Sequence, residues 1–98
     1  MHIFIYGPPG SGKSTVGKEL AKLLESPFAD LDSEIEKSVG KSIPQILDEL
    51  GEPVFRDQET TMLLRMTKES PRVIALGGGA LLRDENRRRA ERNGQIIC

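Results

Sequence analysis

Short apolar runs recur along the chain, and each one stops at a turn or at acidic residues. The first run, residues 1–6, holds β-branched and aromatic side chains and ends at a glycine–proline cluster, which is typical of a buried parallel strand. Runs at 28–32, 72–76 and 95–98 have the same character. The pattern therefore predicts four short strands, the second ending in acids and the third in three glycines.

The segments between these runs show helical periodicity or helix boundary signals. Residues 13–24 and 53–69 each place apolar side chains on one face, and 84–92 form a charged segment that Asn93-Gly94 stops. Because strands and helices alternate, the expected fold class is α/β with a parallel sheet and helices on both faces.

Two capping-box patterns predict two further short helices. Ser33-x-x-Glu36 marks the start of one helix, which Gly40 ends, and Ser42-x-x-Gln45 marks the start of the next. In such a pattern the serine side chain and the glutamate or glutamine side chain each satisfy a backbone N–H of the first turn. Gly51 is a plausible end of the second helix.

Composition and charge narrow the class of protein. With 98 residues, 37% apolar and 30% charged, the chain is expected to form a single domain over 1–98. The formal net charge of −1 argues against a broad nucleic-acid-binding surface, and no apolar run approaches the ~20 residues of a membrane span. One cysteine, Cys98, excludes an internal disulfide and a cysteine-rich zinc site, so the cytoplasm is the expected compartment.

The most specific motif is the glycine-rich segment Gly7–Ser14, which matches G-x-x-x-x-G-K-[ST] in full. It lies between a predicted strand and a predicted helix, as a phosphate-binding loop (Walker A) requires. Glycines allow several N–H groups to point at an anion, and the helix N-terminus adds its dipole. Lys13 can reach the β- and γ-phosphates of a nucleotide, and the Ser14 hydroxyl can ligate Mg²⁺.

The acids that would complete this site lie on the second predicted strand. The strand at 73–76 ends in glycines, so it supplies no Walker B acid, and the N-K-x-D motif of GTPases is absent. Asp30 and Asp32 are two residues apart, so we expect both on one side of the strand, near the phosphate loop. One carboxylate could hold Mg²⁺ through water and the other could accept a hydrogen bond from an acceptor hydroxyl. The lack of a Walker B acid and of the N-K-x-D motif, together with the acids on the second strand, favours a small-molecule kinase.

Two further features bear on binding of the acceptor: an arginine with a nearby glutamate, and the glycine run. Arg56 is a potential bidentate carboxylate binder, and Glu59, three residues later, could orient it. The run 77–79 would let a ligand approach bare backbone. His2 precedes the first strand and is expected to be exposed.

Taken together, these residues resemble the shikimate kinase family. The ordered set is the loop Gly7–Ser14, then Asp30-Leu31-Asp32, then Phe55-Arg56 with Glu59, then Gly77-Gly78-Gly79. The phosphate loop alone is shared by many families, whereas this order of motifs is quite specific. The resemblance implies the P-loop kinase fold and ATP-dependent phosphorylation of the shikimate 3-hydroxyl in aromatic amino acid biosynthesis.

The resemblance also implies a role for each matching residue. Lys13 and Asp32 are the implied catalytic residues, with Asp32 binding the shikimate hydroxyls as well. Ser14 would hold Mg²⁺ directly, and Asp30 would contact it through water. Arg56 would bind the shikimate carboxylate beside Gly78 and Gly79. The implied ATP-phosphate contacts are Gly10, Ser11, Gly12, Lys13, Ser14 and Thr15.

Family members continue well beyond 98 residues, and the last predicted strand has no helix after it. We therefore expect the N-terminal part of a kinase domain, inactive as an isolated chain, with a possible fusion to another enzyme of the pathway. Two alternatives stay open. One is another small-metabolite kinase, such as a gluconate-type enzyme, and the other is a nucleotide-binding module without activity.

Overall fold

The computed structural model describes residues 1–7 and 12–97. Within them, four strands form one sheet in the order β2–β3–β1–β4, and every neighbouring pair is parallel. The strands are β1 (His2–Tyr6), β2 (Phe28–Asp30), β3 (Val73–Leu76) and β4 (Gly94–Ile97). The predicted parallel α/β architecture is therefore confirmed. Predictions about Pro8, Pro9, Gly10, Ser11 and Cys98 concern residues outside the described ranges.

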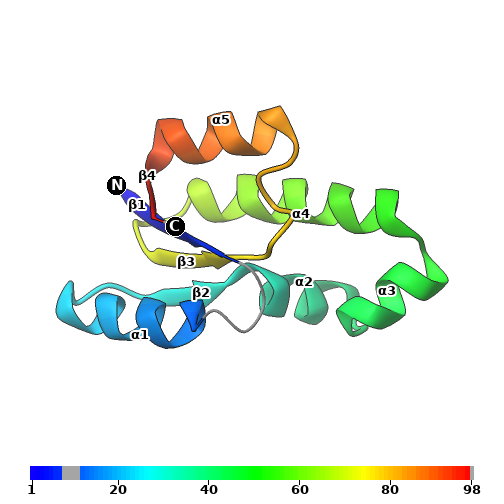
Figure 1. Cartoon of the computed structure of the whole chain (residues 1–98), viewed down its shortest axis with the longest axis horizontal. Helices are drawn as coiled ribbons and strands as arrows, with labels where there is room; N and C mark the ends of the chain where they lie inside the picture. The colour runs from blue at the N-terminus through cyan, green and yellow to red at the C-terminus, as the bar shows by residue number, and fades with distance from the viewer. Residues whose placement is uncertain (8–11, 98) are drawn as a thin grey trace.

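Helices cover both faces of this sheet, as Figure 1 shows: α1 lies on one side, and α4 and α5 lie on the other. A parallel sheet needs this cover because both of its faces are apolar. The helices of the described residues are α1 (Lys13–Leu23), α2 (Leu31–Val39), α3 (Ile43–Glu49), α4 (Glu52–Thr67) and α5 (Asp84–Asn93).

The core is divided between the two faces by the alternation of side chains along the strands. On β1, Phe4 joins the larger cluster with Met62 and Leu63 of α4, whereas Ile5 joins a small cluster with Ala21 of α1. The larger cluster holds most of the buried side chains, so the side that carries α4 and α5 contributes most of the hydrophobic stabilisation.

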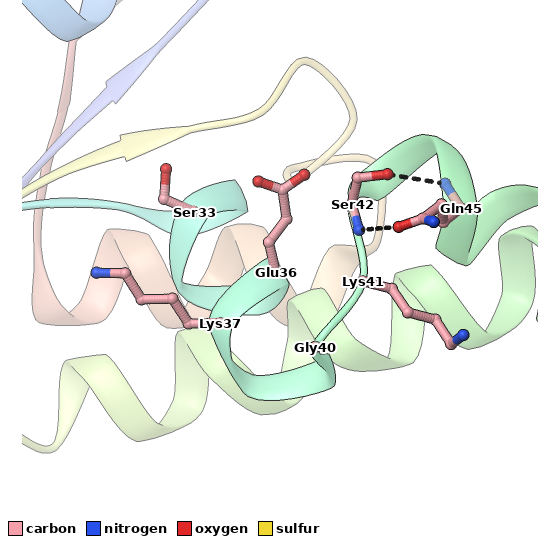
Figure 2. A pocket seen from close by; sticks show the side chains of 7 residues that line it. All are labelled: Ser33, Glu36, Lys37, Gly40, Lys41, Ser42 and Gln45. Atoms are coloured by element: carbon pink, nitrogen blue, oxygen red, sulfur yellow. Dashed lines mark hydrogen bonds between the residues drawn. The ribbon is translucent and has the colours of Figure 1, made fainter.

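The predicted capping box at the start of α3 is confirmed. The Gln45 N–H donates to Ser42 Oγ (3.3 Å), and the Ser42 N–H donates to Gln45 Oε1 (2.9 Å), as Figure 2 shows. Gly40 ends α2 in the left-handed region with φ of 78°, as its position predicts.

The predicted capping box at Ser33 is wrong, and the second strand is shorter than the predicted 28–32. The helix α2 begins at Leu31, and Asp30 is its N-cap: Asp30 Oδ1 accepts from the Ser33 N–H (3.1 Å). An aspartate is as good an N-cap as a serine, and here it lies one turn earlier. Asp32 therefore lies in the first turn of a helix, and the expected strand alternation of Asp30 and Asp32 is also wrong.

The prediction that His2 is exposed is wrong as well. Its side chain is buried (4% exposed), its Nε2 lies 3.3 Å from the Thr67 carbonyl oxygen, and its ring contacts Phe4. Burial of the imidazole lowers the pKa of His2. The helix α4 spans Glu52–Thr67, against the predicted 53–69, and ends near this histidine.

Candidate active site

Three strand ends meet at one edge of the sheet and position the candidate site. Because β2, β3 and β1 are neighbours and parallel, their carboxyl ends lie side by side. Gly7 follows β1, Asp30 ends β2, and the glycine run begins after Leu76 of β3. Ligands of open α/β sheets bind at this edge.

The phosphate side of the site is formed by the end of β1, the start of α1 and the end of β2. Lys13 Nζ donates to the Gly7 carbonyl (3.1 Å), and Ser14 Oγ donates to Asp30 Oδ2 (3.3 Å). Gly12 has φ of 80° and precedes α1, and no side chain among the described residues caps the backbone N–H groups at the start of this helix. Thr15 lies exposed in the first turn.

The pair Ser14 and Asp30 fits a hard cation. A hydroxyl and a carboxylate oxygen in contact are the ligand types that Mg²⁺ accepts, and Mg²⁺ keeps most of its waters rather than taking a full protein cage. Residues 1–7 and 12–97 contain no group of three or more His, Cys, Asp or Glu side chains that could hold a metal ion.

Asp32 points at the start of the glycine run. A Cβ atom built on the buried Gly77 would lie 3.0 Å from Asp32 Oδ1, so the missing side chain leaves room for the carboxylate. Asp32 Oδ1 is itself buried and has no hydrogen-bond partner among the described residues. Burial and then the charge of Asp30 raise the pKa of Asp32. The carboxylate is therefore a hydrogen-bond acceptor with an unused oxygen and increased basicity.

Arg56, on α4, reaches the turn that begins with the glycine run 77–79, which we call the glycine turn. Its Nη1 donates to Glu59 Oε1 (2.9 Å), and its Nε lies 3.5 Å from the exposed Glu52. A Cβ atom on Gly79 would collide with this guanidinium, coming within 2.6 Å of Nη2. The glycine is therefore required for the close approach of Arg56 to the turn. The hydrogen bond to Glu59 fixes one side of the guanidinium.

The ion pair between Arg56 and Glu59 is buried mainly at its glutamate end. The Glu59 side chain is 1% exposed, whereas that of Arg56 is 23% exposed. Burial raises the pKa of Glu59, although the hydrogen bond from Arg56 opposes this effect; the same bond raises the pKa of Arg56. The structure thus brings Asp32, Arg56, Glu59 and the glycine turn together.

Three residues that were not singled out from the sequence hold the glycine turn. Tyr6 donates its hydroxyl to the Gly78 carbonyl (2.8 Å), and Asn86 Nδ2 donates to the Ala80 carbonyl (3.0 Å). Arg83 Nη1 contacts Asp57 Oδ1 (2.9 Å) and thereby ties the end of the turn to α4. The sequence signal for these contacts is weak, because α5 holds two amide side chains, Asn86 and Asn93, among mostly charged residues.

A hollow with a volume of about 480 Å³ lies beside α2 and α3. Figure 2 shows the side chains that line it. None of the candidate site residues lines it. A polar side chain of the hollow instead stabilises the local fold: Glu36 Oε2 accepts from the Ile43 N–H (2.7 Å) and fixes the link between α2 and α3. Its lining residues are Ser33, Glu36, Lys37, Gly40, Lys41, Ser42 and Gln45.

A parallel sheet whose first strand leads through a phosphate-binding motif into a helix, with an aspartate at the end of β2, defines a P-loop kinase fold. The family model described as shikimate kinase matches residues 9–98. The chain belongs to the shikimate kinase family.

Curated relatives and solved structures agree with this assignment. The shikimate kinase of Pseudomonas fluorescens is 45% identical over 96 residues, which cover 98% of this chain and 56% of the relative; that of Thermodesulfovibrio yellowstonii is 44% identical over 97 residues, covering 99% and 56%. The chain thus spans about half the length of these relatives.

Among solved structures, shikimate kinase from Acinetobacter baumannii in complex with shikimate superposes with a TM-score of 0.92 at 42% identity, covering 97% of this chain and 53% of that one. The enzyme from Aquifex aeolicus gives 0.91 at 38% identity, covering 98% and 61%. Within the described residues, no helix is long and apolar enough to cross a membrane.

Proposed function

We propose that the protein transfers the γ-phosphoryl group of ATP to the 3-hydroxyl of shikimate. One observation carries this proposal: an aspartate with an unused, buried oxygen and an arginine converge on the same glycine turn, beside the phosphate side of the site. Shikimate carries hydroxyls and a carboxylate, which are the groups that an aspartate and an arginine recognise. Family membership supports this substrate.

Arg56 would bind the carboxylate and Asp32 the reacting hydroxyl. The fixed separation of the two side chains would then orient the ring relative to the phosphate loop, which is how positioning lowers the barrier to transfer. Gly78 and Gly79 would line the same side, where the absence of Cβ atoms allows the ring to approach the backbone.

In the transfer, the 3-hydroxyl oxygen forms a bond to the γ-phosphorus, and the bond from that phosphorus to the bridging oxygen of ADP breaks. The hydroxyl proton passes to the Asp32 carboxylate, whose raised pKa makes it a better base. Lys13 would neutralise charge on the phosphates. Ser14 and Asp30 would hold a Mg²⁺ ion, which supplies further charge neutralisation when bound. The cytoplasm is the compartment we propose.

The test separates substrate binding from turnover. Calorimetric titration of the 98-residue chain with shikimate and with gluconate measures binding. Turnover is followed by ³¹P NMR with ATP and Mg²⁺, on this chain and on a chimera that continues it with the corresponding C-terminal residues of the Pseudomonas fluorescens relative. We expect the chain to bind shikimate, the chimera to form shikimate 3-phosphate, and the isolated chain to show no turnover. Phosphorylation of gluconate in preference to shikimate would reject the proposal, and nucleotide binding without any acceptor would favour a nucleotide-binding module.

A further inference from the structure

Tyr6 lies between the phosphate side of the candidate site and the glycine turn. It is the last residue of β1 and is paired in register with Leu76, the last residue of β3. Its ring packs against the larger core cluster, which fixes the direction of the side chain. The hydroxyl, at the far end of the ring, donates to the carbonyl of Gly78 over 2.8 Å, across 72 positions of the chain.

The neighbour of Tyr6 belongs to the phosphate side. The carbonyl of Gly7 accepts from Lys13 Nζ. Two consecutive residues therefore contact the two sides of the site, Gly7 through the phosphate-loop lysine and Tyr6 through the glycine turn. A displacement of the turn relative to β1 would break the tyrosine hydrogen bond, so this bond opposes such a displacement.

We propose that Tyr6 is a positioning residue that holds the Gly78 peptide in the orientation that binds the acceptor. Its hydroxyl donates to the Gly78 carbonyl oxygen. Without this hydrogen bond, the Gly78 peptide would be free to rotate and turn its carbonyl toward the acceptor or toward water. The contact itself is independent of the substrate, whereas its effect on shikimate binding rests on the proposed function.

Tyr6→Phe is a clean test because it removes one hydroxyl and leaves the packed ring. We expect shikimate affinity to fall roughly three- to tenfold, the range for one lost neutral hydrogen bond. Affinity for a non-hydrolysable ATP analogue should not change measurably. Thr61→Ala, which removes an exposed hydroxyl from α4, is the matched control and should change neither affinity.

A second readout needs no ligand. The amides of Ala80 and Leu82 donate to the Gly77 and Gly79 carbonyls within the turn, and the Val73 amide donates to Pro27 in the sheet. In Tyr6→Phe, hydrogen exchange should accelerate roughly three- to tenfold at Ala80 and Leu82 and stay unchanged at Val73.

The two readouts distinguish a failure of the proposed function from a failure of the positioning role of Tyr6. If the parent chain binds no shikimate, the proposed function fails, and the exchange rates alone decide whether Tyr6 holds the turn. Unchanged exchange at Ala80 and Leu82 in Tyr6→Phe overturns the positioning role. Equal losses of affinity for shikimate and for the ATP analogue also overturn it, because they would mark a general structural role.

Discussion

Replacing Arg56 with lysine separates the geometry of this side chain from its charge. In the parent chain, Nη1 of Arg56 is bound to Glu59 Oε1, and the rest of the planar guanidinium lies against Gly79. A lysine ammonium has one nitrogen, which the buried Glu59 carboxylate would draw away from the turn. The positive charge stays on α4, whereas the pair of N–H donors that can bind both oxygens of a carboxylate is lost.

The expected loss follows from these contacts. Each charge-assisted hydrogen bond contributes about 1.5–3 kcal/mol, so losing a bidentate pair should cost about 3 kcal/mol, or roughly a hundredfold in shikimate affinity. The free energy of unfolding should change little, because Glu59 keeps a cation. Arg56→Ala should instead lower it by about 3 kcal/mol, since the glutamate would be left buried without a counter-ion.

Calorimetric titration with shikimate and with an ATP analogue, together with urea unfolding, measures both effects. Arg65→Lys is the matched control, because Arg65 lies exposed on the same helix. Equal weakening of both ligands in Arg56→Lys would show that Arg56 supports the fold and does not recognise the acceptor. Full retention of shikimate affinity would refute the bidentate contact itself.

Three other changes have separate expected outcomes. Asp32→Asn should lower the turnover rate in the chimera by about 10²–10⁴-fold while unfolding stability is kept or raised, because a desolvated charge is removed; unchanged turnover would exclude Asp32 as the base. Gly79→Ala should weaken shikimate binding, since its methyl group displaces the Arg56 guanidinium; a titration with unaltered affinity would contradict this. His2 has a pKa lowered by burial, so acid protonates the unfolded chain first, and the free energy of unfolding should fall as the pH drops below about 6.5. Urea unfolding at several pH values should show a smaller fall in His2→Gln, and an identical slope in both chains would exclude His2 as the cause.

The sequence was informative where local chemistry determines structure. Apolar runs placed all four strands, helical periodicity and boundary signals placed the helices apart from the start of α2, and the Ser42–Gln45 capping box has both of its hydrogen bonds. Spacing alone also paired Arg56 with Glu59, because residues three apart on a helix are neighbours.

The sequence was uninformative where distant segments meet. Asp30-Leu31-Asp32 fits a strand that ends in acids as well as a strand that ends at Asp30. The cap from Asp30 and the packing of the buried Leu31 and Ile35 together place the start of α2. The Tyr6–Gly78 contact joins residues 72 positions apart, and the burial of His2 depends on the end of α4. No local pattern carries that information.

The carboxylate of Asp30 divides its two oxygens between different tasks. Oδ1 holds the first turn of α2, the helix that carries Asp32, and Oδ2 faces the Ser14 hydroxyl. A cation drawn to Oδ2 would therefore withdraw electron density from the bond that starts this helix. Under the proposed function, metal occupancy and the placement of Asp32 would thus be linked through one side chain. As a consequence, kinetics of an Asp30 variant would mix a loss of metal affinity with a shift of Asp32, and the two effects separate only if the metal concentration is varied as well.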